Sequence, residues 1–400
     1  MKILAIETSC DETSVAIIKT KGSSRQPNVD VLAHFISSQI ELHAQFGGVV
    51  PNLAKREHQR LLVPLLIKAL KKSGLYEISK FKNQDSKTQS HSLKLKELLE
   101  REPDLLVEFK KKISKLVIPD IDAIAVTNGP GLAPALWVGV NCAKALSLVW
   151  KKPIIPMNHM KGHLYAAFIG DVVREKKPMQ FPKIRFPMLA LLVSGGHTEL
   201  VLMKKFGSYE IIGETLDDAA GEAFDKVARM LDLGYPGGPV IAAEAAKFKD
   251  LKIKSLNIRF PRPMIKSNDY NFSFSGLKTS VLYFIRDLAD KKSVRAYTPV
   301  IAKEFQDAVV DVLVAKTIRA AQQYGVKTII VGGGVSANKL LRERLSIEVK
   351  DKCKGVDFFV PHPSVTGDNA LMIALAAVLD GKKKAPNEIG AEGNLRLGDV

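Results

Sequence analysis

Two stretches of the chain share one order of apolar and polar positions. Residues 2–19, KILAIETSCDETSVAIIK, read as an apolar strand, a polar turn from Ser9 to Thr13 and a second strand. Residues 188–204, MLALLVSGGHTELVLMK, read as a strand, a turn of small and hydroxyl residues, and a second strand. Each pattern predicts a β-hairpin with small or hydroxyl side chains at its tip.

Each predicted hairpin is followed further along the chain by a strand that runs into a glycine turn and a helix. These segments are residues 121–146 and residues 326–345. Their strands are near-continuous apolar runs, which are typical of strands covered on both faces of a sheet. Because both halves repeat this order, we expect a duplicated α/β fold with a central cleft. Ligands of such sheets bind at strand ends, near glycine turns and helix N-termini.

The repeat divides the chain, whose 400 residues are too many for one ordinary core, into two lobes. We expect an N-terminal lobe over 1–180, a C-terminal lobe over 181–375 and a helix end and tail over 376–400. Residues 71–118 are polar and lysine-rich and fit neither half. They are interpreted as an insertion that is partly helical and partly mobile. Residues 247–272 are expected to form a loop.

Composition adds a constraint on partners. The chain is 46% hydrophobic and 25% charged, as in globular proteins, but its net charge is +17. Such an excess favours a polyanionic partner, and a solvated lysine-rich surface explains it equally well. No apolar run approaches the roughly 20 residues that span a bilayer, so we expect no membrane segment. The three widely spaced cysteines indicate neither a disulfide framework nor a CxxC metal site.

The sharpest chemical feature is the segment NHMKGH at residues 158–163. Asn158 is a candidate N-cap, and the i,i+4 spacing places His159 and His163 on one helical face. Two histidines so placed can chelate one divalent metal, with a third ligand from elsewhere. Incidental surface or capping histidines are the alternative. Because Met160 follows His159, the general-base glutamate of an HExxH peptidase is missing.

Three glycine turns lie at residues 128–131, 194–196 and 332–334. Glycine serves any tight strand-to-helix turn, so each turn alone indicates little. Two of them occupy matching places in the repeated halves. That placement fits turns that hold phosphate and ribose, and generic loops are an equally good explanation.

Two acidic positions have competing interpretations. Residues 215–226 predict a helix start with acidic first-turn residues, which ordinary capping explains. Asp225 lies two turns in, where capping is excluded, and suits a ribose-hydroxyl acceptor. The segment YPGGP at 235–239 is predicted to close this helix, either as a simple turn or as backbone that approaches a nucleotide. Asp368 precedes an apolar helix and is interpreted as its cap.

Taken together, these segments resemble the tRNA N6-adenosine threonylcarbamoyltransferases, formerly described as O-sialoglycoprotein endopeptidases. The matching segments cover nearly the whole chain outside the insertion: ETSCDET (7–13), NGPGLAPAL (128–136), NHMKGH (158–163), LLVSGGHTEL (191–200), DDAAGEAFDKVARML (217–231), YPGGP (235–239), FSFSGLKT (272–279) and GGGVSAN (332–338). The resemblance implies a duplicated fold of the actin, sugar-kinase and heat-shock-chaperone type. Leu192 is typical of the bacterial and mitochondrial branch, since the archaeal-type branch has tyrosine there.

The resemblance also implies roles for individual residues. His159 and His163 become ligands of one divalent metal, iron or zinc with magnesium as an alternative, and Asp368 becomes the third ligand. Asp11 and Glu12, at the hairpin tip facing the cleft, become candidates for acid–base catalysis. The nucleotide part of the donor would contact a further set, namely Leu192, Val193, Ser194, Gly195, Gly196, Asp225, Gly238 and Asn338.

Two positions depart from the family pattern. Lys161 stands where the family usually has an acidic residue between the histidines, and SVTGDN replaces the usual cysteine–threonine–Asp–Asn around the third ligand. Neither departure removes a ligand, but both change the surroundings of the predicted metal site.

By this resemblance, the enzyme transfers a threonylcarbamoyl group from threonylcarbamoyl-adenylate to N6 of adenosine 37 in tRNAs that read ANN codons, releasing AMP. A metallopeptidase, an ATPase or kinase of the same fold, and an inactive scaffold are the alternatives. The expected partners are tRNA, a separate synthase that makes the donor, and a second copy in a homodimer. The expected location is the mitochondrial matrix, with a presequence absent from this chain; the cytoplasm is the alternative.

Overall fold

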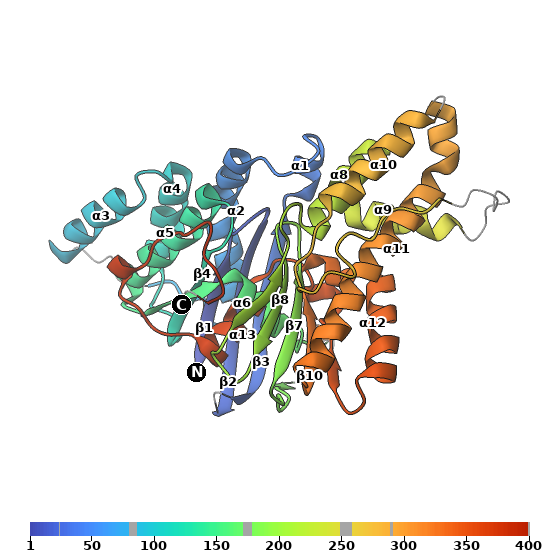
Figure 1. Cartoon of the computed structure of the whole chain (residues 1–400). Coiled ribbons are helices and arrows are strands. Elements are labelled where there is room, and N and C mark those ends of the chain that lie inside the picture. Colours follow the sequence, from blue (N-terminus) through green and yellow to red (C-terminus); the bar gives the residue numbers. More distant parts are fainter. Residues whose placement is uncertain (24, 80–85, 171–177, 249–257, 289–290, 399–400) are drawn as a thin grey trace. The chain divides into compact units, whose positions relative to one another are not determined.

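The computed structural model describes the chain except residues 24, 80–85, 171–177, 249–257, 289–290 and 399–400 (Figure 1). It divides into two compact units. The first comprises Met1–Glu41, Val49–Lys183 and Gly367–Val400, and the second comprises Leu42–Gly48 and Ile184–Thr366. Within the described residues, each unit contains one sheet.

The first unit has a sheet in the strand order β5-β4-β1-β2-β3-β6. Strand β1 pairs antiparallel with β2 and parallel with β4, and β4 continues parallel to β5. Strands β2 and β3 are antiparallel, as are β3 and β6. The strands are β1 (Lys2–Glu7), β2 (Glu12–Ser23), β3 (Gln26–Ser38), β4 (Ala123–Gly129), β5 (Ile154–Asn158) and β6 (Met179–Gln180).

The second unit repeats this arrangement in a sheet of order β11-β10-β7-β8-β9. Strand β7 pairs antiparallel with β8 and parallel with β10, and β10 continues parallel to β11. The strands are β7 (Met188–Val193), β8 (Thr198–Met203), β9 (Glu210–Glu214), β10 (Thr328–Gly332) and β11 (Asp357–Phe359). Because the order and direction of five strands match, the predicted duplicated α/β fold is confirmed.

Helices pack on the first sheet from both sides. Residues Leu4 and Ile6 of β1 share one core with α2 and α5, whereas α13 contacts β1, β2 and α6. The helical elements are α1 (Ile40–Ala44, which begins in this unit and continues into the second), α2 (Pro51–Lys72), α3 (Ser86–Leu98), α4 (Pro103–Lys112), η1 (Ile113–Lys115), α5 (Ala133–Trp150), α6 (His159–Ala166), α13 (Ala370–Asp380) and η5 (Pro386–Glu388).

The second unit has its own core, in which Phe224 and Phe305 meet edge to face. Helix α11 contacts both α9 and α12. The helical elements of this unit are α8 (Ala220–Met230), α9 (Gly237–Lys247), α10 (Ser275–Asp287), α11 (Lys291–Gln323), η3 (Gly334–Ala337), α12 (Lys339–Lys352) and η4 (Pro363–Val365).

Helix α13 differs from the sequence expectation in its placement. The sequence assigned residues 181–375 to one lobe and 376–400 to a tail, but Gly367–Val400 belongs to the first unit. The physical reason is that α13 buries nearly its whole surface against α6, β1 and β2. Its apolar composition predicted burial without indicating which sheet it would cover.

The lysine-rich insertion is more ordered than a surface loop. Its helices bury Leu95 on α3 and Leu105 and Phe109 on α4, and these side chains join the core of the first unit. The helical part of the interpretation is thus seen in the structure. Its mobile part stays a prediction, and residues 80–85 of the insertion lie outside the described residues.

Helix α5 is, among the described residues, the one helix whose length and composition would allow it to cross a membrane. The expectation that no apolar run approaches this length is corrected for this helix. However, 61% of the stretch is buried, and α5 packs against α2 and β4. Its apolar surface therefore belongs to the core of the first unit.

Candidate metal centre and nucleotide-binding turns

The histidine pair lies at the point where β5 ends and α6 begins. Asn158 caps α6, since its side chain accepts hydrogen bonds from Met160 N at 2.8 Å and Lys161 N at 3.4 Å. The predicted N-cap is confirmed. This cap starts the helix directly at His159, so His159 and His163 are one turn apart, and both are buried.

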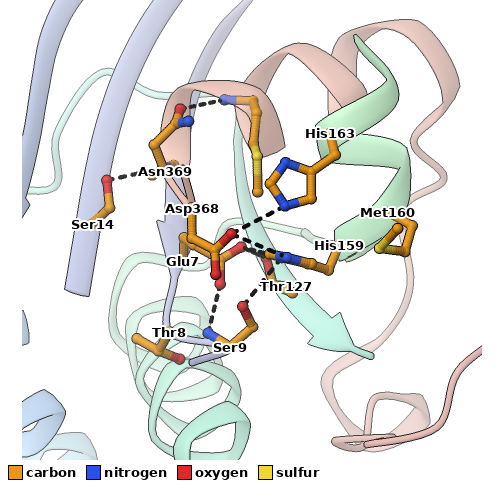
Figure 2. Close-up of polar contacts among 12 residues, drawn as sticks. Glu7, Thr8, Ser9, Ser14, Thr127, His159, Met160, His163, Asp368 and Asn369 are labelled. Carbon is orange, nitrogen blue, oxygen red and sulfur yellow. Dashed lines mark hydrogen bonds and ion pairs between the residues drawn. The ribbon is translucent and has the colours of Figure 1, made fainter. Parts of the chain in front are cut away.

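Asp368 joins the two histidines from the start of α13 (Figure 2). Its Oδ1 lies 3.3 Å from His159 Nε2 and 3.1 Å from His163 Nε2. One ligand atom from each of the three residues lies within 4.8 Å of the others. The capping interpretation of Asp368 is wrong: Asn369 caps α13, accepting a bond from Met372 N at 3.0 Å.

The other side of the His159 ring is held by groups that the sequence did not single out. His159 Nδ1 lies 3.2 Å from Glu7 Oε2 and 3.1 Å from Ser9 Oγ. Glu7 is fully buried and accepts bonds from Ser9 N at 2.6 Å and from Thr127 Oγ1 at 2.5 Å. These contacts orient the ring so that Nε2 points towards Asp368. The sequence signal that could have indicated this role is the position of Glu7, a glutamate at the end of an apolar strand.

The charges of the cluster depend on one another. Burial alone would lower the pKa of His159, but Asp368 and Glu7 raise it well above its ordinary value. Burial and the neighbouring His159 lower the pKa of His163. Burial would raise the pKa of Asp368, but the two histidines hold it far below its usual range. The cluster therefore requires a positive charge, which a proton on His159 supplies.

A divalent metal fits this requirement. Both nitrogens of the buried His163 ring lack a hydrogen-bond partner among the described residues, although Nε2 is 3.1 Å from Asp368. Imidazole nitrogens and a carboxylate are ligands that zinc and iron accept, and Glu7 resembles the carboxylates that orient metal-bound histidines. Binding would displace the proton from the cluster.

The first hairpin carries the two predicted acid–base residues. Asp11 is buried, and Glu12 accepts a hydrogen bond from Ser38 Oγ at 3.2 Å. Burial raises the pKa of Glu12 to about 10, with further contributions from Asp368 and Asp11. The turn is anchored by His58, whose Nε2 lies 2.9 Å from the carbonyl oxygen of Cys10. Without a metal, the raised pKa favours the protonated carboxyl of Glu12, which can also donate a hydrogen bond.

The glycine turns of the second unit contain open space. Gly195, Gly196 and Gly238 have φ values that other residues adopt, and a Cβ added to any of them would meet no atom within 4 Å. Gly333 is different: its φ is +86°, and a Cβ would lie 2.4 Å from Val193 O. The first three glycines are not required by packing, so they leave room for a ligand that approaches the backbone. Leu192 is fully buried and can contribute only main-chain groups.

Asp225 and Asn338 already have partners within the protein. Asp225 Oδ1 accepts a bond from Gly237 N at 2.7 Å, at the start of α9. YPGGP therefore begins α9, and the prediction that it closes the preceding helix is wrong. Asn338 caps α12 and donates to Gln306 Oε1 at 2.9 Å. Both residues thus shape the turns, and a direct contact with a nucleotide stays a prediction.

The acidic pair before α8 does not cap that helix. Helix α8 begins at Ala220, after both acidic residues. Asp217 instead accepts bonds from Phe274 N and Ser275 N, at the start of α10. Asp218 forms ion pairs with Lys226 and Lys278.

Fold and site together define a class: duplicated α/β proteins that carry a His–His–Asp cluster whose two histidines are buried. More particularly, the chain belongs to the tRNA N6-adenosine threonylcarbamoyltransferase family, which it matches over residues 30–80 and 100–375. It is 41% identical to the enzyme of that name from Bacillus subtilis over 96% of this chain and 91% of the relative. The Ralstonia pickettii enzyme is also 41% identical, over 95% of this chain and 91% of the relative.

Among solved structures, full-length HypF in a phosphate- and nucleotide-bound form covers 94% of this chain and 46% of its own, with 12% identity and a TM-score of 0.49. The family relatives do not favour the metallopeptidase or kinase alternatives.

Proposed function

We propose that this chain transfers the threonylcarbamoyl group of threonylcarbamoyl-adenylate to N6 of adenosine 37 in ANN-decoding tRNAs, with a divalent metal held by His159, His163 and Asp368. Membership of the family supports the reaction. The observation that carries the metal proposal is the convergence of three ligand atoms within 4.8 Å, two of them on buried histidines. Iron or zinc suits these ligands, with magnesium as the alternative.

The reaction forms one bond and breaks another. The exocyclic amine of adenosine attacks the carbamoyl carbon, the bond from this carbon to the phosphate oxygen breaks, AMP leaves, and the amine loses a proton. When bound, the metal would supply Lewis-acid stabilisation of developing negative charge. In the metal-free chain the raised pKa of Glu12 favours its protonated form, which suits hydrogen-bond donation better than removal of the amine proton. Asp11 is the remaining candidate for accepting that proton.

The second unit suits the nucleotide part of the donor. The open backbone at Gly195, Gly196 and Gly238 supports phosphate and ribose contacts through main-chain N–H groups. Ser194 supports the turn, since its N donates to His197 O at 2.8 Å.

The partners and the location extend the proposal. The donor is made by a separate synthase, the chain acts as a homodimer, and it works in the mitochondrial matrix. The bacterial-type segment around Leu192, the lysine-rich insertion and the basic charge support this location. The location is tested by fractionating cells that make the native protein. Finding the protein only in the cytosol would contradict the mitochondrial proposal.

The proposed function is tested by reconstitution. The chain is incubated with the donor synthase, threonine, bicarbonate, ATP and an ANN-decoding tRNA, and the nucleosides are then analysed by mass. The expected product is threonylcarbamoyladenosine, and its absence with every component active would contradict the proposal.

Variants of the cluster test the metal. The double variant His159→Ala/His163→Ala should keep its fold but lose bound metal and nucleoside formation. Both losses should exceed the 10- to 100-fold that is typical when only supporting contacts are removed. Metal content by mass spectrometry and circular dichroism provide the readouts. His362→Ala, outside the cluster, is the matched control. Full activity of the double variant would end the metal proposal.

A further inference from the structure

A pocket of about 550 Å³ lies in the first unit and shares no residue with the histidine cluster. Helix α3 contributes Lys94, Glu97 and Leu98 to its wall, and α5 contributes Lys144. The segment after α13 closes it with residues 386–387. Figure 1 shows this last segment, in red, beside α3 and α5. The volume is in the range of pockets that hold a small molecule or one nucleotide.

Most of this wall lies outside the part of the chain that matches the family. The match covers 30–80 and 100–375, so α3 falls entirely in the unmatched interval, and residues 386–387 follow its end. The family match therefore leaves α3 and residues 386–387 unassigned, and the chemistry of the pocket is inferred from its own residues.

The pocket is basic. Lys94 and Lys144 form no ion pair among the described residues, and Glu97 is the one acidic residue of the wall. Burial lowers the pKa of Lys144, so its ammonium group lies in a partly desolvated place. Residues 382–384, three exposed lysines, lead directly to the segment that closes the pocket. A bound anion would supply the missing counter-charge.

An exposed aromatic ring lies beside one of these lysines, Lys144. Trp137 lies two helical turns before Lys144 on α5, is 38% exposed, and has the Lys144 ammonium 5.6 Å from its ring centre. The other tryptophan, Trp150, is buried in the core. An accessible ring with a lysine beside it, at the edge of a basic pocket, is a combination that suits single-stranded nucleic acid, with a base stacked on the ring and phosphates paired with ammonium groups.

We propose that this pocket binds a single-stranded RNA segment of the tRNA substrate, with a base stacked on Trp137 and phosphates paired with Lys94 and Lys144. The proposal rests on tRNA being the substrate. An acidic peptide would satisfy the lysines, but it would make no use of the exposed ring, so RNA is the partner that uses the whole site.

Fluorescence of the full-length chain provides a direct test, because Trp137 is exposed and Trp150 is buried. A single-stranded oligoribonucleotide of eight residues is titrated in about 0.1 M salt, with an RNA duplex and polyglutamate as comparison ligands. We expect the single strand to quench the exposed ring and to bind most tightly. Equal binding of the duplex or of polyglutamate would overturn the assignment.

Variants then assign the contacts. Trp137→Leu should weaken binding, followed by filter retention, by about tenfold or more. Lys94→Glu/Lys144→Glu should do the same and make the salt dependence of log K shallower by about 0.7 for each lysine. Lys21→Glu/Lys205→Glu changes the net charge equally at exposed lysines elsewhere and should bind nearly as wild type. If the double variant misfolds, Lys94→Glu alone can be measured in its place, because Lys94 is exposed. Equal loss in the control pair would show that general charge, not the pocket, binds RNA.

The two proposals fail separately. The pocket variants should raise the KM for tRNA and leave kcat nearly unchanged, because neither lysine belongs to the histidine cluster. If the wild-type chain binds the oligonucleotide at this pocket but forms no modified nucleoside, the proposed function fails, whereas binding of single-stranded RNA at the pocket stands. An unchanged KM in the pocket variants would overturn the pocket assignment.

Discussion

Lys161 is an unusual residue for the middle of a candidate metal site. It lies between the two histidines on α6, is 4% exposed, and pairs with Asp380 at 2.8 Å. Asp380 ends α13, the helix that follows Asp368. This ion pair therefore joins the two helices whose starts bring the three candidate ligands together. Because the lysine is buried, removing its partner leaves a charge that is poorly solvated.

This pair should position the ligands. We expect Lys161→Met to weaken metal binding by about 10- to 100-fold, as loss of supporting contacts usually does. The free energy of unfolding should fall by about 3 kcal/mol, less than for a fully buried pair because Asp380 is partly exposed. Metal competition titration and denaturant unfolding measure the two effects. Lys161→Met/Asp380→Leu should recover part of both, and a double variant no better than the single one would contradict a positioning role.

Glu12 should make the stability of the metal-free protein depend on pH. Its pKa is raised from 4.5 to about 10, chiefly by burial and then by Asp368 and Asp11. Below pH 4.5 the side chain is protonated in both the folded and unfolded chains. As the pH rises towards 10 the unfolded chain ionises first, so folding loses up to about 1.4 kcal/mol per pH unit from this group.

The variant Glu12→Gln removes this titration. In chelator-treated protein, we expect Glu12→Gln to equal wild type in unfolding free energy near pH 4 and to become progressively more stable than wild type above it. Denaturant unfolding over a series of pH values measures the difference. Parallel profiles for the two proteins would contradict the raised pKa.

At the scale of elements, the site depends on how closely α6 and α13 approach. A Cβ added to Gly162 would lie 2.8 Å from Ile373 Cδ1 and 3.0 Å from Met372 Cγ. The absence of a side chain at this position thus permits the contact that places Asp368 beside the histidines. The cap at Asn158 and the cap at Asn369 fix where each helix starts.

Gly162→Ala should therefore lower the free energy of unfolding by about 1–2 kcal/mol, since overpacking exceeds the gain of up to about 1 kcal/mol in helix propensity. Tryptophan fluorescence reports on the first unit, which contains both Trp137 and Trp150. Gly170→Ala is the matched control, because a Cβ there would meet nothing within 4 Å. Equal stability of the two variants would contradict the packing argument.

At the scale of the whole molecule, net charge bears on assembly and on tRNA binding. The chain carries +17, and a homodimer would double the basic surface available to one tRNA. We expect sedimentation to show self-association and tRNA modification to require only the donor synthase as an added protein. Binding of tRNA should weaken steeply with salt, because phosphate contacts release counterions. A monomer that stays inactive until further subunits are added would contradict this prediction.

The sequence by itself determined the local features: the paired hairpins, the glycine turns, the Asn158 cap and the spacing that puts His159 and His163 on one helical face. These follow from periodicity and capping, which act over a few residues. The family resemblance supplied Asp368 as a third ligand, where local reasoning from the sequence gave only a cap.

Only the tertiary structure decided which distant groups meet. It placed α13 in the first unit, buried Glu7 behind His159 and paired Lys161 with Asp380. It also gave Asp225 a partner at the start of α9 and Asn338 a partner in Gln306 of α11. Long-range packing brings these groups together, and burial then sets their charges. A carboxylate at the end of an apolar strand reads the same in sequence whether it is solvated or orients a histidine. The difference lies in the side chains that surround it after folding.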